Sequence, residues 1–150
     1  LSRGSYMYNW ERGNSTGGMC VKSGDSLVGE EVNKVTFSLS KTGTPPQATL
    51  YARVFNTASA LTVKHEFGSL ATSELTGTTT AYAFESASTY TLANNDVVAI
   101  YCDNSATSYP DDMVLQGGTS GSTSTLKYAD YNTAWSSTGN QLPYLILAKA

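Results

Sequence analysis

The chain has 150 residues, of which 40% are hydrophobic and only 14% charged, and its formal net charge is −3. This length suits one core, so we expect residues 1–150 to form a single domain. The nine Lys and Arg residues are scattered along the chain, and no basic stripe could neutralise phosphates. Nucleic acid is therefore not an expected partner. A membrane span is not expected either, because no apolar run approaches the roughly 20 residues that a bilayer requires.

With so few charges, solubility must come from Ser, Thr, Asn and Gly, a composition that is common in extracellular β proteins. The chain begins at Leu1 rather than at Met. This start favours a trimmed mature product or an excised domain. We therefore predict a secreted, extracellular protein.

Apolar and polar residues alternate with a period of two along the whole chain, and helical periodicity is absent. In the clearest case, Val35, Phe37 and Leu39 alternate with hydroxyl-bearing residues. The pattern predicts about ten short strands, near residues 5–11, 18–23, 35–40, 48–57, 61–67, 80–85, 97–103, 113–116, 124–129 and 142–149. Many short strands at near-regular spacing indicate an all-β fold, a two-sheet antiparallel β-sandwich of the jelly-roll type.

The strand over residues 48–57 is apolar on both faces. Its first face holds Leu50, Ala52 and Val54, while Tyr51, Arg53 and Phe55 lie on the second. The second face of this strand is therefore expected to be partly covered or used. Further along, residues 117–122 are rich in Gly and Ser and predict a flexible connection between strands. Residues 123–129 could form a polar sheet edge, guarded only by Lys127.

Two cysteines, Cys20 and Cys102, are the only thiols. Cys102 alternates with Val98 and Ile100 and should face the core, whereas Cys20 alternates with Lys22 and should face the other way. The alternatives are a disulfide that closes a long loop and a pair consisting of one buried and one semi-exposed thiol.

The run from Val32 to Pro45, followed by residues 48–54, resembles a pattern of jelly-roll modules in large secreted proteins of bacteria, archaea and their viruses. In those modules the run reads Ile-x-x-Val-x-Phe-x-Leu-x-Lys-x-Gly-x-Pro. The run from Leu92 to Ile100 is similar to their Leu-x-x-Gly-Asp-x-Ile-x-Ile strand, with Asn95 where Gly is usual. The likeness covers roughly residues 29–103. It implies a jelly-roll and either carbohydrate binding or a role as an adhesin or filament domain, and it transfers no binding residue.

Catalysis is not expected. His65 is the only histidine, and no Gly-x-Ser-x-Gly elbow accompanies it, so a Ser-His-Asp triad has no support. One His and two distant Cys do not have the spacing of a zinc site. A glycoside hydrolase needs two carboxyl groups that flank the scissile bond. Neither the Glu30-Glu31 pair nor Glu85 suggests such an arrangement, and we predict that the protein is not an enzyme.

No cofactor is expected beyond a structural calcium ion. Asp103, Asn104, Asp111 and Asp112 flank one loop, residues 105–110, and could supply oxygen ligands of the kind that calcium prefers. The alternative is that these residues form Asx turns and end strands.

Aromatic residues give the most useful indication of function, because ten Tyr and two Trp are many for so polar a chain. Their rings are apolar and their tips polar, which suits the faces of sugars. The predicted ligand-binding residues are those that cluster with amides and carboxylates in predicted loops or share a strand face: Trp10, Tyr109, Tyr128, Asp130, Tyr131, Asn132 and Trp135. The alternative is that these aromatics fill the core or sheet corners.

Two functions follow from these observations. The first is a non-catalytic carbohydrate-binding module that binds a polysaccharide through exposed Tyr and Trp with hydrogen bonds from Asp and Asn. The second is a structural or adhesive subunit of an extracellular filament, surface layer or virion, which assembles by β-strand pairing through its edges. In that case the N-terminal residues 1–11 could pair with a neighbouring subunit.

Overall fold

The structure is a computed structural model that describes residues 7–9, 15–41, 43, 48–103, 114–120, 126–131, 134–139, 141–143 and 145–150. Side chains are described for residues 16–41, 43, 48–102, 134–136 and 145–150. In these ranges the chain forms twelve strands and one short 3-10 turn, at Thr72–Glu74. The predicted all-β fold is confirmed.

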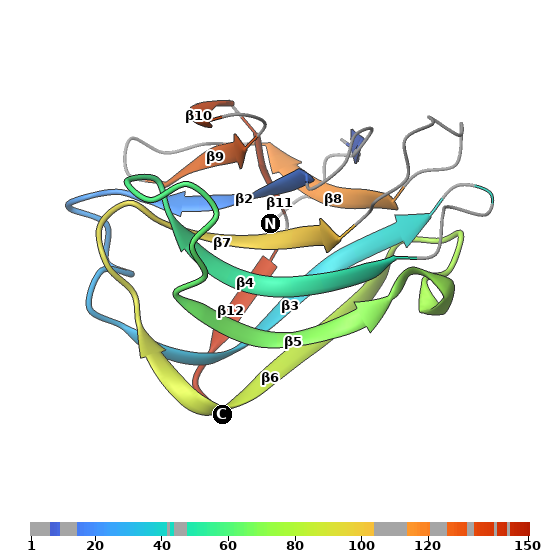
Figure 1. The fold of residues 1–150 in the computed structure, drawn as a ribbon, viewed down its shortest axis with the longest axis horizontal. Helices are drawn as coiled ribbons and strands as arrows, with labels where there is room; N and C mark the ends of the chain where they lie inside the picture. Colours follow the sequence, from blue (N-terminus) through green and yellow to red (C-terminus); the bar gives the residue numbers. More distant parts are fainter. Residues whose placement is uncertain are drawn as a thin grey trace.

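The strands make two antiparallel sheets. The β7 sheet has the order β10-β9-β2-β7-β4-β5. Its strands are β2 (Ser15–Val21), β4 (Thr49–Asn56), β5 (His65–Ala71), β7 (Asp96–Asp103), β9 (Leu126–Tyr131) and β10 (Trp135–Gly139). Figure 1 shows β2, β7, β4 and β5 of this sheet running side by side.

The other sheet, the β3 sheet, has the order β1-β8-β3-β12, with β11 also paired to β8 and β6 to β3. Its strands are β1 (Met7–Asn9), β3 (Glu31–Lys41), β6 (Thr80–Thr91), β8 (Val114–Ser120), β11 (Gln141–Pro143) and β12 (Leu145–Ala148). The jelly-roll connectivity stays a prediction. It is supported by the alternation of the chain between the sheets, which gives β1, β8, β3 and β6 to one sheet and β2, β7, β4 and β5 to the other.

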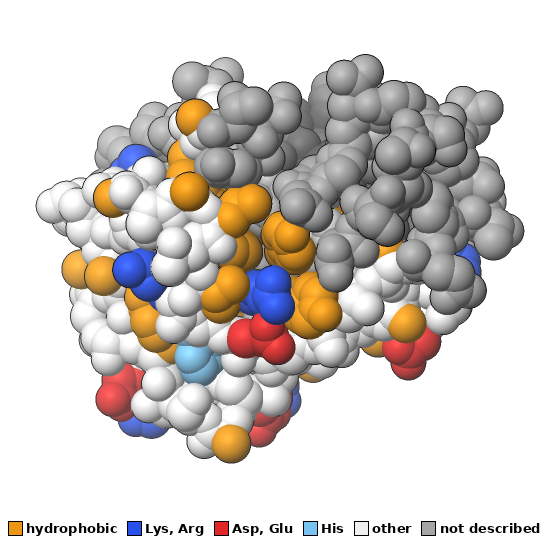
Figure 2. All heavy atoms as spheres, viewed as in Figure 1, with side chains coloured by type: hydrophobic (Ala, Val, Ile, Leu, Met, Phe, Trp, Pro, Cys, Tyr) orange, Lys and Arg blue, Asp and Glu red, His pale blue; other side chains and the backbone are white. Residues whose placement is uncertain are grey.

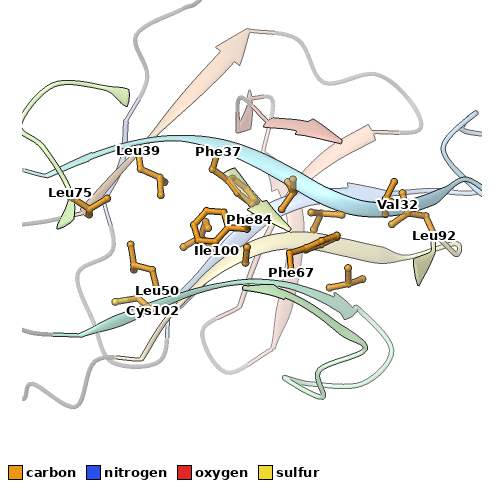
Figure 3. Close-up of a cluster of buried hydrophobic side chains, with 14 residues drawn as sticks. Val32, Phe37, Leu39, Leu50, Phe67, Leu75, Phe84, Leu92, Ile100 and Cys102 are labelled. Carbon is orange, nitrogen blue, oxygen red and sulfur yellow. The ribbon is translucent and has the colours of Figure 1, made fainter. Parts of the chain in front are cut away.

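The core lies between the two sheets and follows the period-two pattern. Val35, Phe37 and Leu39 of β3 are fully buried, as predicted. They face Leu50 and Ile100 of the β7 sheet, as Figure 3 shows for the labelled side chains. In this core the rings of Phe37 and Phe84 meet edge to face, with their centroids 6.3 Å apart.

Several element boundaries differ from the prediction. β5 begins at His65 rather than near residue 61, because Asn56 accepts a hydrogen bond from the backbone N–H of Ala58 and the following residues bond locally in turns. The predicted connection at residues 117–122 is instead strand as far as Ser120, since β11 pairs with Gly118, Thr119 and Ser120.

Two segments proposed for pairing between subunits are paired within the chain. β9 lies between β2 and β10, and β10 pairs with residues 128–131, so the prediction of a sheet edge at residues 123–129 is wrong for residues 128–129. Residues 126–127 pair with β2. Residues 123–125 lie outside the described part of the chain. At the N-terminus, Met7–Asn9 pairs with β8 of the same chain.

The turn before β7 places Asn95 in a backbone conformation that Gly adopts most readily. Asn95 has a φ of +68°, the left-handed region that Asn tolerates better than other residues with a side chain. Its side-chain oxygen accepts a hydrogen bond from Lys22 Nζ at 3.1 Å. Asn95 therefore supplies both the backbone conformation of Gly and a contact that Gly could not make.

The cysteines lie on opposite faces of the β7 sheet and are not joined by a disulfide bond. Cys102 packs in the core between the sheets, as predicted. Cys20 is not semi-exposed, because it is covered in a second apolar cluster with Phe55, Val97 and Ala99. Burial raises the pKa of the Cys20 thiol, only partly opposed by Lys22.

Candidate functional site

The outer face of the β7 sheet carries a row of aromatic rings. We call Trp135, Phe55, Tyr101 and Tyr51 the aromatic row. Its ring centroids are 5.8 Å apart between Trp135 and Phe55, 6.2 Å between Phe55 and Tyr101, and 6.3 Å between Tyr101 and Tyr51. The strands place these rings together because the alternate residues of β4 and β7 are committed to the core.

The members of the row differ in exposure. Phe55 is 1% exposed and forms the base of the row, whereas Tyr51, Tyr101 and Trp135 are half-buried and leave part of each side chain in contact with solvent. Trp135 also has a structural task, because its Nε1–H donates to the backbone oxygen of Ala60 at 2.6 Å. This bond and the packing of Trp135 over the Cys20 cluster hold the connection between β4 and β5 against the sheet.

An ion pair lies beside the row. Arg53 and Glu66 face each other across β4 and β5, and both Nε and Nη2 of Arg53 lie 2.7 Å from Oε2 of Glu66. The Arg53 Cζ is 3.8 Å from the ring centroid of Tyr51 and 5.3 Å from that of Tyr101, which is cation–π geometry. Figure 2 shows hydrophobic side chains gathered around one basic and one acidic side chain over β4, β5 and β7.

This arrangement offers two kinds of contact to a ligand. The half-buried rings present apolar faces, and the ion pair presents donors and acceptors close to them. Guanidinium groups only donate hydrogen bonds and ionised carboxylates only accept them. A ligand with flat apolar patches and adjacent hydroxyl groups could therefore use both.

The sequence-predicted ligand residues are placed as follows. Trp135 belongs to the aromatic row. Tyr128, Asp130 and Tyr131 lie on β9, where the backbone of Tyr131 pairs with Trp135, but their side chains are not among those described. Trp10, Tyr109 and Asn132 lie outside the described residues. The prediction for these six positions stays open.

Sequence reasoning did not name Tyr51, Tyr101, Arg53 or Glu66 as binding residues. The sequence did contain a signal for Tyr51 and Arg53, because they lie with Phe55 on the second face of the strand over residues 48–57. Tyr101 and Glu66 join them only through strand register, which pairs Tyr51 with Tyr101 and Arg53 with Glu66.

The predicted calcium site stays untested. Asp103 ends β7, and Asn104, Asp111 and Asp112 lie outside the described residues. Within the described ranges, no three His, Cys, Asp or Glu side chains gather in a way that could hold a metal ion.

His65 belongs to a separate polar–aromatic contact between β5 and β6. Its Nε2 lies 2.9 Å from Ser86 Oγ, and its ring stacks on Tyr90 with centroids 5.4 Å apart. The rings of His65 and Phe67 meet in a T-shaped arrangement, with centroids 4.9 Å apart. Burial lowers the pKa of His65, and the neighbouring Glu66 carboxylate opposes this shift only in part.

We expect this lowered pKa to make the fold less stable in mild acid. The neutral imidazole is favoured in the folded state, so the contribution of His65 is complete above the unfolded pKa of about 6.5. It is lost as the pH falls from there through the lower folded pKa. Urea unfolding at pH 7.5 and 5.5 should show a drop in midpoint that shrinks in His65→Gln. An equal drop in both proteins would contradict this assignment.

Comparison of the chain with protein-family models, with curated proteins and with solved structures found no match. The described residues include no helix with the length and apolar character that crossing a membrane requires. The outer face of the β7 sheet therefore provides the geometry that bears on function.

Proposed function

We propose that the protein is a non-catalytic carbohydrate-binding module that binds a polysaccharide on the outer face of its β7 sheet. The observation that carries the proposal is the aromatic row with the Arg53–Glu66 pair beside it. Sugar C–H groups pack on aromatic faces, while sugar hydroxyls need polar partners at the edge. The row supplies the first and the ion pair the second.

The rigidity of the face also supports this function. Tyr51, Phe55 and Tyr101 are carried by two central strands that pair along their full length, and Arg53 is held by Glu66 and by the ring of Tyr51. A ligand that meets groups already ordered loses less conformational freedom on binding. Such a face suits repeated weak contacts along a polymer.

A non-catalytic role is supported by the state of Glu66. Hydrolysis of a glycosidic bond requires one carboxyl group as acid and a second as nucleophile or base. Glu66 lies against the row, but its carboxylate is engaged by Arg53 at 2.7 Å. It is therefore better suited to recognising hydroxyl groups than to donating a proton.

Replacing Tyr51 or Tyr101 by Ala should weaken glycan binding at least about tenfold, the effect of losing about 1.4 kcal/mol of binding free energy. Each substitution removes one half-buried ring from the row. Affinity electrophoresis in gels containing soluble polysaccharides, followed by calorimetry on those that retard the protein, measures the change.

Ile146→Ala is the matched control, because Ile146 is 51% exposed and lies on β12 of the other sheet. It should bind as the unchanged protein does. Thermal unfolding of each variant shows that the fold is retained. Equal binding by Tyr51→Ala, Tyr101→Ala and Ile146→Ala would refute the proposed face.

The alternative, a structural or adhesive subunit that assembles by strand pairing, is favoured by one observation. Among the described strands, β6 pairs with β3 alone, and its residues 80–85 contain neither Lys nor Pro. The register of this pair shifts between Val32 and Lys34, which is the kind of bulge that discourages pairing beyond it. Light scattering over a wide concentration range distinguishes an assembling subunit from a binding module that stays monomeric.

A further inference from the structure

The Arg53–Glu66 pair is internally neutral, which bears on the kind of glycan that the face can take. Arg53 has both Nε and Nη2 within 2.7 Å of one Glu66 oxygen, and its side chain is only 19% exposed. An acidic sugar would have to bind the guanidinium next to Glu66, whose carboxylate already neutralises the charge of Arg53. It would then place a second carboxylate or a sulfate beside the Glu66 carboxylate, and the chain as a whole already carries a charge of −3.

We propose that the face is specific for a neutral glycan and that Arg53 and Glu66 are the residues that determine this specificity. This inference rests on the proposed carbohydrate-binding function and adds the class of ligand to it. Adjacent hydroxyls of a neutral sugar can accept from the guanidinium and donate to the free Glu66 oxygen at the same time. Neither charge has to lose its partner for these bonds to form.

The cation–π contacts determine where on the face the ion pair can form these hydrogen bonds with sugar hydroxyls. The Arg53 Cζ lies over the Tyr51 ring, 3.8 Å from its centroid, and 5.3 Å from the centroid of Tyr101, so the ion pair borders the ring surfaces that it leaves open to a sugar. A sugar ring packed on these surfaces can direct its hydroxyl edge toward the pair. The exposure of Glu66 supports this, since its side chain is 42% exposed and open to a ligand.

Glu66→Gln tests the inference, because it removes the negative charge while keeping the shape of the side chain. Neutral probes are mixed-linkage β-glucan, xylan and galactomannan, and acidic probes are polygalacturonate and alginate. The unchanged protein should prefer a neutral probe. In Glu66→Gln, affinity for that probe should fall about tenfold, the loss typical of one charged hydrogen bond. Affinity for the acidic probes should rise, because Arg53 is no longer neutralised.

Glu85→Gln is the matched control. Glu85 pairs with Lys34 at 3.0 Å on the β3 sheet, so this variant changes the net charge equally at an ion pair far from the aromatic row in the fold. It should leave both affinities unchanged. The inference is overturned if the unchanged protein prefers an acidic probe through Tyr101, or if Glu66→Gln and Glu85→Gln behave alike. Binding of no probe by the unchanged protein would instead overturn the proposed function itself.

Discussion

Replacing Phe37 by Ala should lower the free energy of unfolding by about 3–5 kcal/mol. Phe37 is fully buried in the centre of β3, where its ring meets Phe84 edge to face at 6.3 Å. The substitution removes a large apolar surface and leaves a cavity between the two sheets. The strands of each sheet are held by extensive backbone pairing, so the sheets cannot move together to close the cavity. Since the free energy of unfolding of small domains is only about 5–15 kcal/mol, this one change would remove a large part of it.

Equilibrium unfolding in urea, followed by circular dichroism, measures this loss. Ile146→Ala, on the neighbouring β12 and half exposed, is the control and should cost less than about 1 kcal/mol. Phe37→Leu should fall between the two, because it keeps most of the buried volume. If Phe37→Ala unfolds at the same urea concentration as Ile146→Ala, the core has been assigned to the wrong face of β3.

The strands that turn an apolar face to the core could be predicted from the sequence, and the reason is physical. In β3, β4 and β7 each inward residue touches the same core, so burial imposes the period-two pattern directly on the chain. β10 shows no such pattern. It is a strand because Trp135 and Ser136 pair with β9, and its own sequence does not predict this pairing. The start of β5 could not be predicted for a similar reason, because local turn bonds after Asn56 compete with pairing.

The candidate site was predictable only in part. Alternation in one strand places Tyr51, Arg53 and Phe55 on a common face, whatever the partner strands are. It says nothing about which residues lie opposite. Glu66 and Tyr101 reach Arg53 and Tyr51 through the registers of β5 and β7 on β4, and the β5 register shifts between Ala52 and Arg53. The burial of Cys20 was missed for the same reason, because the residues that cover it come from distant segments.

The side chain of Asp96 connects the turn before β7 to β4 and β6 through hydrogen bonds. Its carboxylate is 1% exposed and accepts three hydrogen bonds. Tyr90 Oη donates to Oδ2 at 3.0 Å, the backbone N–H of Ala93 to Oδ2 at 2.7 Å, and Asn56 Nδ2 to Oδ1 at 2.9 Å. Three segments of the chain, from β4, β6 and the turn, therefore meet at one buried charge.

Asp96→Ala should lower the free energy of unfolding by about 3–5 kcal/mol, because hydrogen bonds to a charged group contribute about 1.5–3 kcal/mol each and do not add fully. The substitution also leaves the three donors without their acceptor. Asp25→Ala is the matched control. Asp25 is a half-buried turn residue whose carboxylate accepts from the N–H of Leu27, and its loss should cost about 1 kcal/mol.

Tyr90 provides a second measurement, which distinguishes loss of this contact from general destabilisation. Burial and then the hydrogen bond and charge of Asp96 raise the pKa of Tyr90 to about 12. The folded state thus favours the neutral phenol, and this contribution is complete below the unfolded pKa of about 10 and is lost as the pH rises through about 12. In Asp96→Asn, which keeps the size of the side chain, the pKa of Tyr90 should fall toward 10. Ultraviolet titration against Tyr90→Phe isolates this phenol from the other nine. An unchanged titration would mean that Asp96 does not hold the Tyr90 hydroxyl, and the turn would then need another anchor to β6.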